Sequence, residues 1–131
     1  MTLLNKILQL IGQNVIVEHG TSGIWTYDKY ANGDCKIRGT YYVTTSTIAV
    51  TTAYGNIYMS DLLNVTLPFS LTTDYATTSQ VYISPVGTGT DWAAKCYMSS
   101  ANTASFFWIN PVPYTVTARS FIECFILGKW K

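Results

Sequence analysis

The fold of this chain is decided by residues 24–45, which read IWTYDKYANGDCKIRGTYYVTT. Residues 24–30 and 35–45 are rich in the aromatic and β-branched side chains that favour strands. Between them lies Ala31-Asn32-Gly33-Asp34, and the Asn-Gly pair is a strong hairpin signal. The stretch therefore predicts two antiparallel strands joined by a tight turn.

The same sequence pattern, short β-type runs separated by turn residues, extends from this hairpin in both directions. Residues 19–23 read as a turn, and residues 114–127 read as one long final strand. Many short strands with frequent turn signals are typical of sandwiches and barrels. We therefore predict an all-β domain over residues 15–131, an antiparallel β-sandwich of jelly-roll-like type.

The final expected strand is apolar on both of its faces. One face carries Ile122, Cys124 and Ile126, and the other carries Phe121, Phe125 and Leu127. A sheet with one wet face should alternate more cleanly between apolar and polar residues. The second face is therefore expected to be covered, either by edges or loops of the facing sheet or by a neighbouring subunit. We favour the subunit, with Phe121, Phe125 and Leu127 at the interface, because buried aromatic residues are enriched in such contacts.

Residues 1–14 are predicted to form a short N-terminal α-helix. Leu4, Ile7 and Ile11 recur at spacings of three and four, as in the seam of a coiled coil. Such a short helix is marginal alone, so its apolar stripe must be covered. It either packs on the sheet of its own domain or forms a coiled-coil-like stalk between identical chains. The second alternative makes Leu4, Ile7 and Ile11 trimer-interface residues.

Composition excludes several classes of function. The 131 residues suit one domain, and only 11% of them are charged, with a net charge of +1. No basic stripe is present to bind nucleic acid, so no nucleic-acid partner is expected. No apolar run approaches the roughly 18 residues that a membrane span requires, so no membrane partner is expected either.

Catalytic, metal and cofactor motifs are missing from the sequence. The one histidine, His19, has no accompanying GxSxG elbow, and neither glycine-rich stretch resembles a phosphate-binding loop. We therefore expect no enzyme activity, no metal and no cofactor. Glycoside hydrolysis is the one enzyme class that the sequence does not exclude, because it needs only two opposed carboxylates. The acidic residues are Glu18, Asp28, Asp34, Asp61, Asp74, Asp91 and Glu123. Aspartates in turns usually cap the backbone, so we favour that role for them.

Three cysteines, Cys35, Cys96 and Cys124, occur without a CxxC pair. This number and spacing argue against a zinc site and against a full disulfide framework. One bridge plus a free thiol remains an alternative. We favour three buried thiols in a protein that folds in a reducing cytosol.

Aromatic residues near expected loops suggest saccharide binding. A sugar ring has an apolar face that packs on an aromatic ring, while its hydroxyl groups need polar partners. The candidate contacts are Trp92, Asp91, Tyr54, Tyr58 and Tyr75. The alternative is that these aromatic side chains belong to the core.

Two segments resemble tail proteins of phages and prophages of Gram-positive bacteria. Residues 17–30, VEHGTSGIWTYDKY, with Gly33 and Gly39-Thr40-Tyr41 after them, resemble a recurring block in those proteins. The ending ILGKWK, residues 126–131, resembles the way they commonly end. The resemblance implies the trimeric tip domain of a tail fibre or baseplate protein, with a role in receptor binding. No binding residue carries over, because we interpret the matched motifs as structural.

The expected function is therefore that of a non-enzymatic, homotrimeric tip module in the virion, produced in the bacterial host cytoplasm. Its expected partners are host cell-surface saccharide and other phage tail proteins. One alternative is a purely structural tail protein without a saccharide site. A small glycan-degrading enzyme is a more distant alternative.

Overall fold

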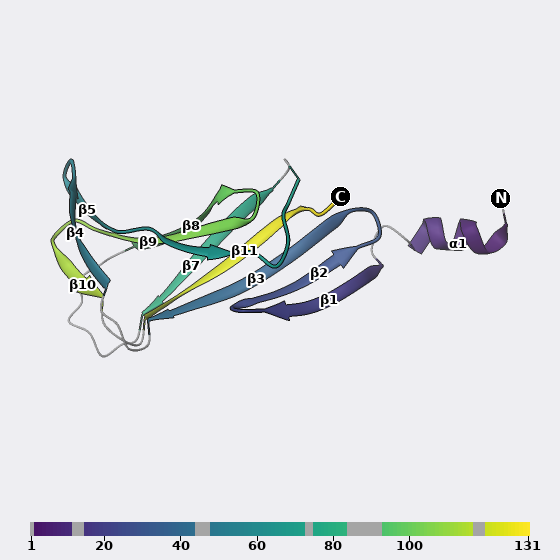
Figure 1. Cartoon of the computed structure of the whole chain (residues 1–131), viewed down its shortest axis with the longest axis horizontal. Coiled ribbons are helices and arrows are strands. Elements are labelled where there is room, and N and C mark those ends of the chain that lie inside the picture. The colour runs from purple at the N-terminus through teal and green to yellow at the C-terminus, as the bar shows by residue number, and fades with distance from the viewer. Residues whose placement is uncertain (1, 12–14, 44–47, 73–74, 84–92, 117–119) are drawn as a thin grey trace.

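A computed structural model describes residues 2–11, 15–43, 48–72, 75–83, 93–116 and 120–131. Two antiparallel β-sheets and one short helix account for most of these residues (Figure 1). The predicted all-β, sandwich-like fold is confirmed. Among the described residues, no helix has both the length and the apolar character needed to span a bilayer.

In the first sheet, the last strand of the chain lies between two earlier strands. Its strands, in spatial order, are β1 (Ile16–Ser22), β2 (Trp25–Tyr30), β3 (Asp34–Val43), β11 (Ser120–Lys129) and β7 (Ala76–Ile83). Strand β11 pairs with β3 over its full length, from Ser120 opposite Val43 to Lys129 opposite Asp34. Its other edge pairs with β7. The chain thus closes this sheet by inserting β11 between β3 and β7.

The second sheet is centred on β9 (Thr103–Asn110). Strand β8 (Ala93–Ser100) pairs with one edge of β9, and β5 (Ile57–Ser60) and β6 (Leu63–Thr66) pair with the other. Beyond β5 lie β4 (Ile48–Tyr54) and then β10 (Tyr114–Val116). Strand β8 also lies beside β7, so the two sheets approach each other along this side (Figure 1).

The hairpin between β2 and β3 forms where the sequence predicts it. Gly33 has a φ of 97°, a backbone conformation that glycine adopts without steric cost, and its N–H donates to the carbonyl of Tyr30 at 3.0 Å. The turn predicted at residues 19–23 is wrong, because Ser22 pairs with Trp25 and the turn is confined to Gly23-Ile24. His19 accordingly lies within β1, opposite Asp28.

The core lies between the two sheets. It is lined by Trp25, Ile37, Ile122, Cys124 and Ile126 from the first sheet and by Val50, Cys96, Ala104, Phe106, Trp108 and Val116 from the second. The ring centroids of Trp25 and Phe106 lie 6.1 Å apart across this space. The indole Nε1 of Trp25 also donates to the carbonyl oxygen of Thr66 at 2.8 Å, which ties β2 to the end of β6.

Gly39 allows Trp25 to lie flat against β3. The two residues are cross-strand partners, and a Cβ on Gly39 would overlap the indole ring of Trp25. Glycine is therefore required here for close approach, because the bulky indole occupies the space where a side chain would project.

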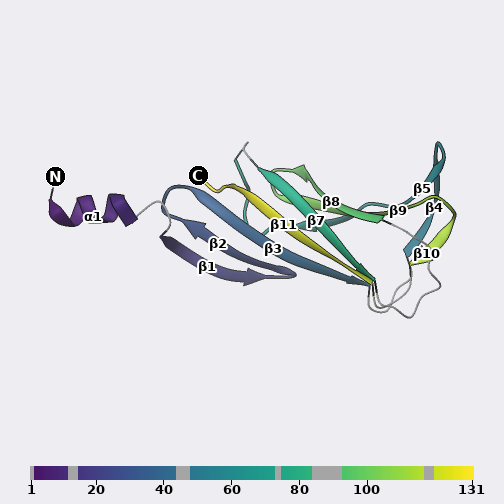
Figure 2. The same cartoon turned by 180° about the vertical axis from the view of Figure 1, so that it is seen from behind.

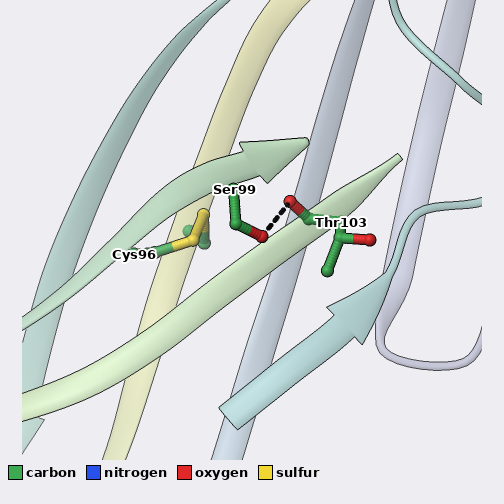
Figure 3. Close-up of a disulfide and its surroundings, with 4 residues drawn as sticks. Cys96, Ser99 and Thr103 are labelled. Atoms are coloured by element: carbon green, nitrogen blue, oxygen red, sulfur yellow. Dashed lines mark hydrogen bonds between the residues drawn. A yellow bond between two sulfur atoms is a disulfide. The ribbon is translucent and has the colours of Figure 1, made fainter. Parts of the chain in front are cut away.

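A disulfide joins the two sheets. Cys96 on β8 is bonded to Cys124 on β11, with their Cα atoms 6.1 Å apart, and both residues are buried (Figure 3). Next to it in the same view, the Ser99 hydroxyl donates to the carbonyl of Thr103 across the β8–β9 hairpin at 3.2 Å. The favoured prediction of three free thiols is wrong, and the alternative of one bridge plus a free thiol is confirmed. Cys35 is the free, buried cysteine.

The long final strand predicted at residues 114–127 is two strands in different sheets. Val116 ends β10, opposite Ile48 in the second sheet, whereas Ser120 begins β11 in the first. The chain crosses between sheets because the buried faces of both must be filled from this segment: Val116 and Ile122 are each at most 1% exposed. Alternation within β11 places Ile122 inside and leaves Phe125 and Leu127 38% and 54% exposed.

Helix α1 (Leu3–Ile11) stands beyond the end of both sheets in the two opposite views (Figures 1 and 2). Thr2 caps it, since its hydroxyl oxygen accepts from the Asn5 N–H at 3.2 Å. Leu4 and Ile7 of the predicted apolar stripe are 64% and 41% exposed. The helix is amphipathic, as predicted, and the side chain of Ile11 lies outside the described part.

Candidate functional site

The candidate site is a hollow of about 600 Å³ on the outer face of the second sheet, which we call the second-sheet hollow. Its walls combine aromatic, aliphatic and charged side chains from β4, β5, β8, β9 and the segment after β5. They are Thr52, Tyr54, Met59, Ser60, Asp61, Leu62, Lys95, Tyr97 and Phe107.

A β-bulge in β4 directs two of these residues outward. Val50 pairs with Ser60 and is buried, whereas the register shifts before Thr52, which pairs with Met59. Strict alternation would point Thr52 to the same side as Val50. The extra residue reverses this, so Thr52 and Tyr54 face the hollow rather than the core.

The aromatic side chains of the hollow are accessible. Tyr54 at the end of β4 is 72% exposed, and Tyr97 on β8 is 39% exposed. The Tyr97 ring meets the Phe107 ring edge-on, with their centroids 5.8 Å apart. Apolar ring surfaces are thus available to pack against a flat, partly apolar ligand.

Polar groups also line the second-sheet hollow. The Ser60 hydroxyl donates to the carbonyl of Asp61 at 3.0 Å and accepts from the Trp108 backbone N–H at 2.9 Å. These two bonds anchor the chain just before the Asp61 carboxylate. Lys95 enters from β8, and within the described residues neither charged group forms an ion pair.

The sequence-predicted contacts are only partly brought together. Tyr54 lines the second-sheet hollow, but Tyr58 packs against the core because it faces inward, opposite Asn110. Tyr75 is 39% exposed and immediately precedes β7 in the first sheet, so it is not part of this hollow. Asp91 and Trp92 lie outside the described residues.

Sequence reasoning missed Tyr97 and Phe107. Their signal was the alternation within β8 and β9: Ala94 and Cys96 are buried, so Lys95 and Tyr97 must point outward. Phe107, likewise, lies between the fully buried Phe106 and Trp108. Alternation reveals which side chains share a face, but not that β4 and β5 continue the same surface.

The outer face of the first sheet holds a second, smaller hollow of about 280 Å³, which we call the first-sheet hollow. It is lined by His19, Thr26, Asp28, Lys36, Ile37, Arg38, Phe125, Ile126 and Leu127. Phe125 and Leu127, two of the predicted interface residues, thus lie open at its side. Phe121 packs against Tyr42 on the same face, with their ring centroids 5.3 Å apart. The role of these three residues in subunit contact stays a prediction.

Among the described residues, Glu18 and Asp34 are carboxylates with a lowered pKa. A hydrogen bond from Lys29, 2.8 Å away, lowers the pKa of Glu18, aided by a second bond from the Tyr27 hydroxyl. The hydrogen bond between the Tyr27 hydroxyl and Glu18 also raises the pKa of Tyr27. Lys129 likewise lowers the pKa of Asp34. A general acid in glycoside hydrolysis needs a raised pKa, so Glu18 and Asp34 are poorly suited to that role.

Within the described residues, no group of three or more histidine, cysteine, aspartate or glutamate side chains is placed to hold a metal ion. Comparisons with protein-family models, with curated proteins and with solved structures found no match to this chain.

Proposed function

We propose that this chain is a non-enzymatic, saccharide-binding tip module of a phage tail fibre or baseplate protein. In this proposal it acts as a homotrimer of jelly-roll-like sandwiches in the virion, attached to other tail proteins. The observation that carries the binding function is the second-sheet hollow, where exposed aromatic rings stand beside a carboxylate and an ammonium group.

The chemistry of this hollow suits a saccharide. Tyr97 and Phe107 offer apolar ring surface to the C–H face of a sugar, while Asp61 and Lys95 offer an acceptor and a donor to its hydroxyl groups. A volume of about 600 Å³ accommodates a small number of sugar rings. The hollow also lies on the sheet whose β4–β5 hairpin is at the end of the molecule opposite α1 (Figure 1).

Replacing Tyr97 by Ala should weaken saccharide binding by about tenfold to a hundredfold per site. The substitution removes the binding free energy that comes from burying one aromatic ring and from its packing against the sugar. A glycan array identifies the ligand, and calorimetry with that ligand then measures the affinity. Tyr42→Ala is the matched control, because Tyr42 is 60% exposed but lies on the first sheet.

Binding that survives in Tyr97→Ala and Tyr54→Ala would remove this hollow as the site. An array without any bound glycan, together with no attachment to whole bacterial cells, would favour the purely structural tail protein. Release of sugar from cell walls that depends on Asp61 would instead favour a glycan-degrading enzyme.

The proposed trimer rests on the apolar stripe of α1. Leu4 and Ile7 are exposed in the single chain, and the helix stands away from both sheets. Three helices that bury this stripe against one another would form a short stalk. Three equal binding sites on one stalk would also convert weak saccharide affinity into avidity.

Light scattering at micromolar concentration should report a trimer, and Leu4→Ser with Ile7→Ser should shift it toward monomer. The reason is that two apolar residues per chain leave the helix seam. Lys6→Gln is the control, because Lys6 lies off the predicted apolar stripe. A monomeric wild-type chain would contradict the homotrimer without bearing on the saccharide site.

The assignment to a phage tail rests on the resemblance of residues 17–30 and 126–131. The disulfide is compatible with it, since Cys96 and Cys124 would be oxidised most readily after the particle leaves the host cytoplasm. Immunogold labelling of particles from a lysed host would test it, and labelling at the tail tip is the expected result.

A further inference from the structure

We propose that the first-sheet hollow is a second ligand site, which binds the phosphate or carboxylate group of an anionic saccharide. This inference does not rest on the second-sheet hollow, because the two hollows lie on different sheets and share no residue. Its basis is the placement of two cations beside an open apolar wall.

The two cations come from neighbouring outward positions of β3. Lys36 and Arg38 are two residues apart, so both side chains project from the outer face of the first sheet, and both are exposed. Ile37 between them points into the core and is 1% exposed. Two cationic residues, Lys36 and Arg38, therefore line the hollow from the same face of β3.

In the described part of the chain, neither Lys36 nor Arg38 forms an ion pair with a carboxylate. Asp28 is the cross-strand partner of Lys36, yet its carboxylate contacts His19 instead, with Nδ1 and Oδ1 2.5 Å apart. The Lys36 ammonium lies 5.6 Å from the centroid of the Tyr30 ring. The carboxylate nearest in the ladder is thus engaged by another side chain, and Lys36 and Arg38 remain available to an anion.

The opposite wall of the hollow is apolar. Phe125 lies directly across from Arg38 and Leu127 lies directly across from Lys36, both on β11. They are 38% and 54% exposed. An anion alone would need only the cations, whereas a ligand that also covers Phe125 and Leu127 needs a carbon-rich body. A sugar with a charged substituent has both parts.

Arg38 is suited to recognise the charged group. A guanidinium presents a planar fork of donors that matches two oxygens of a carboxylate or phosphate. Thr26 on β2 is the cross-strand partner of Arg38. Its side chain lines the same hollow and adds a hydroxyl group. The charged group is therefore expected over Arg38, with the sugar ring extending over Phe125 and Leu127.

The test is an NMR titration of the isotope-labelled full chain with three probes: a glucose phosphate, glucuronic acid and glucose. Saturable shifts of the amides of residues 36–38 and 125–127 are expected with at least one of the two anionic probes. Whichever of them binds more tightly identifies phosphate or carboxylate as the preferred group. Glucose, which lacks the charge, should not produce these shifts.

Lys36→Gln combined with Arg38→Gln should weaken binding of the anionic probe by about tenfold or more, because two charge-assisted hydrogen bonds are lost. The matched control is Lys6→Gln combined with Lys131→Gln, which removes the same charge from exposed positions outside the hollow. It should bind as the wild type does.

Four results would overturn the proposal: no saturable shift with either anion, equal shifts with glucose, equal weakening in the control, or no weakening in the Lys36/Arg38 variant. Light scattering of both double variants completes the test. A change of oligomeric state in the Lys36/Arg38 variant alone would show that this face is an interface between copies of the chain rather than a ligand site.

Discussion

Replacing Trp25 by Ala should lower the free energy of unfolding by about 3–5 kcal/mol, which is a large share of the stability of a small domain. The Trp25 side chain is only 1% exposed and packs against Phe106 of the opposite sheet. Its removal leaves a cavity between the sheets. It also leaves the carbonyl of Thr66 without the indole donor that now lies 2.8 Å away. Urea denaturation followed by circular dichroism measures the change.

Tyr42→Ala provides the comparison for this prediction. Tyr42 is another large aromatic residue of the first sheet, but it is 60% exposed and faces outward. Its loss should cost no more than about 1 kcal/mol, mainly from the contact with Phe121. If both substitutions destabilised the chain equally, Trp25 would not be the anchor between the sheets.

Breaking the disulfide between Cys96 and Cys124 should cost about 3–4 kcal/mol. The bond closes a loop between residues 28 positions apart, and the constraint it places on the unfolded chain sets this magnitude. We expect Cys96→Ala to shift the urea midpoint downward, and a reducing agent to shift the wild type in the same direction. Alkylation of the unfolded, unreduced chain followed by mass spectrometry should find one modified cysteine, Cys35, rather than three.

Cys35→Ala separates this effect from thiol chemistry elsewhere. Burial raises the pKa of the Cys35 thiol to about 11, so little reactive thiolate forms near neutral pH to exchange with the disulfide. The reducing agent should therefore still destabilise Cys35→Ala and should have little further effect on Cys96→Ala. A reducing agent that left the wild type unchanged would contradict a stabilising role for the bond.

Local signals in the sequence predicted the sandwich-like fold and the β2–β3 hairpin well. Asn32-Gly33 supplies the turn, and alternating residues in β3 and β11 supply the buried face. The segment around Gly20 was misread because glycine usually marks a turn. Here Gly20 sits within β1, since a Cβ at that position would overlap the Tyr27 ring on β2. This requirement for glycine comes from a contact between strands, which the local sequence does not show.

Relations between strands were the harder part to predict. Alternation within the final strand placed Cys124 on the same face as Ile122 and Ile126. The local sequence does not show that β8 packs against β11 and brings Cys96 to Cys124. The second-sheet hollow depends on the same kind of information. Tyr54 was predicted as a contact, whereas Tyr97 and Phe107 join it only because β4, β5, β9 and β8 form one sheet.

The position of β11 has a consequence for biosynthesis. The ribosome makes Ser120–Lys129 after every other described strand, yet this segment is the partner of both β3 and β7. Until it emerges from the exit tunnel, β3 and β7 each lack a neighbour, and half of the disulfide is missing. Completion of the first sheet must therefore await the synthesis of residues 120–129, and nascent chains stopped before residue 120 should be substrates for chaperones or proteases.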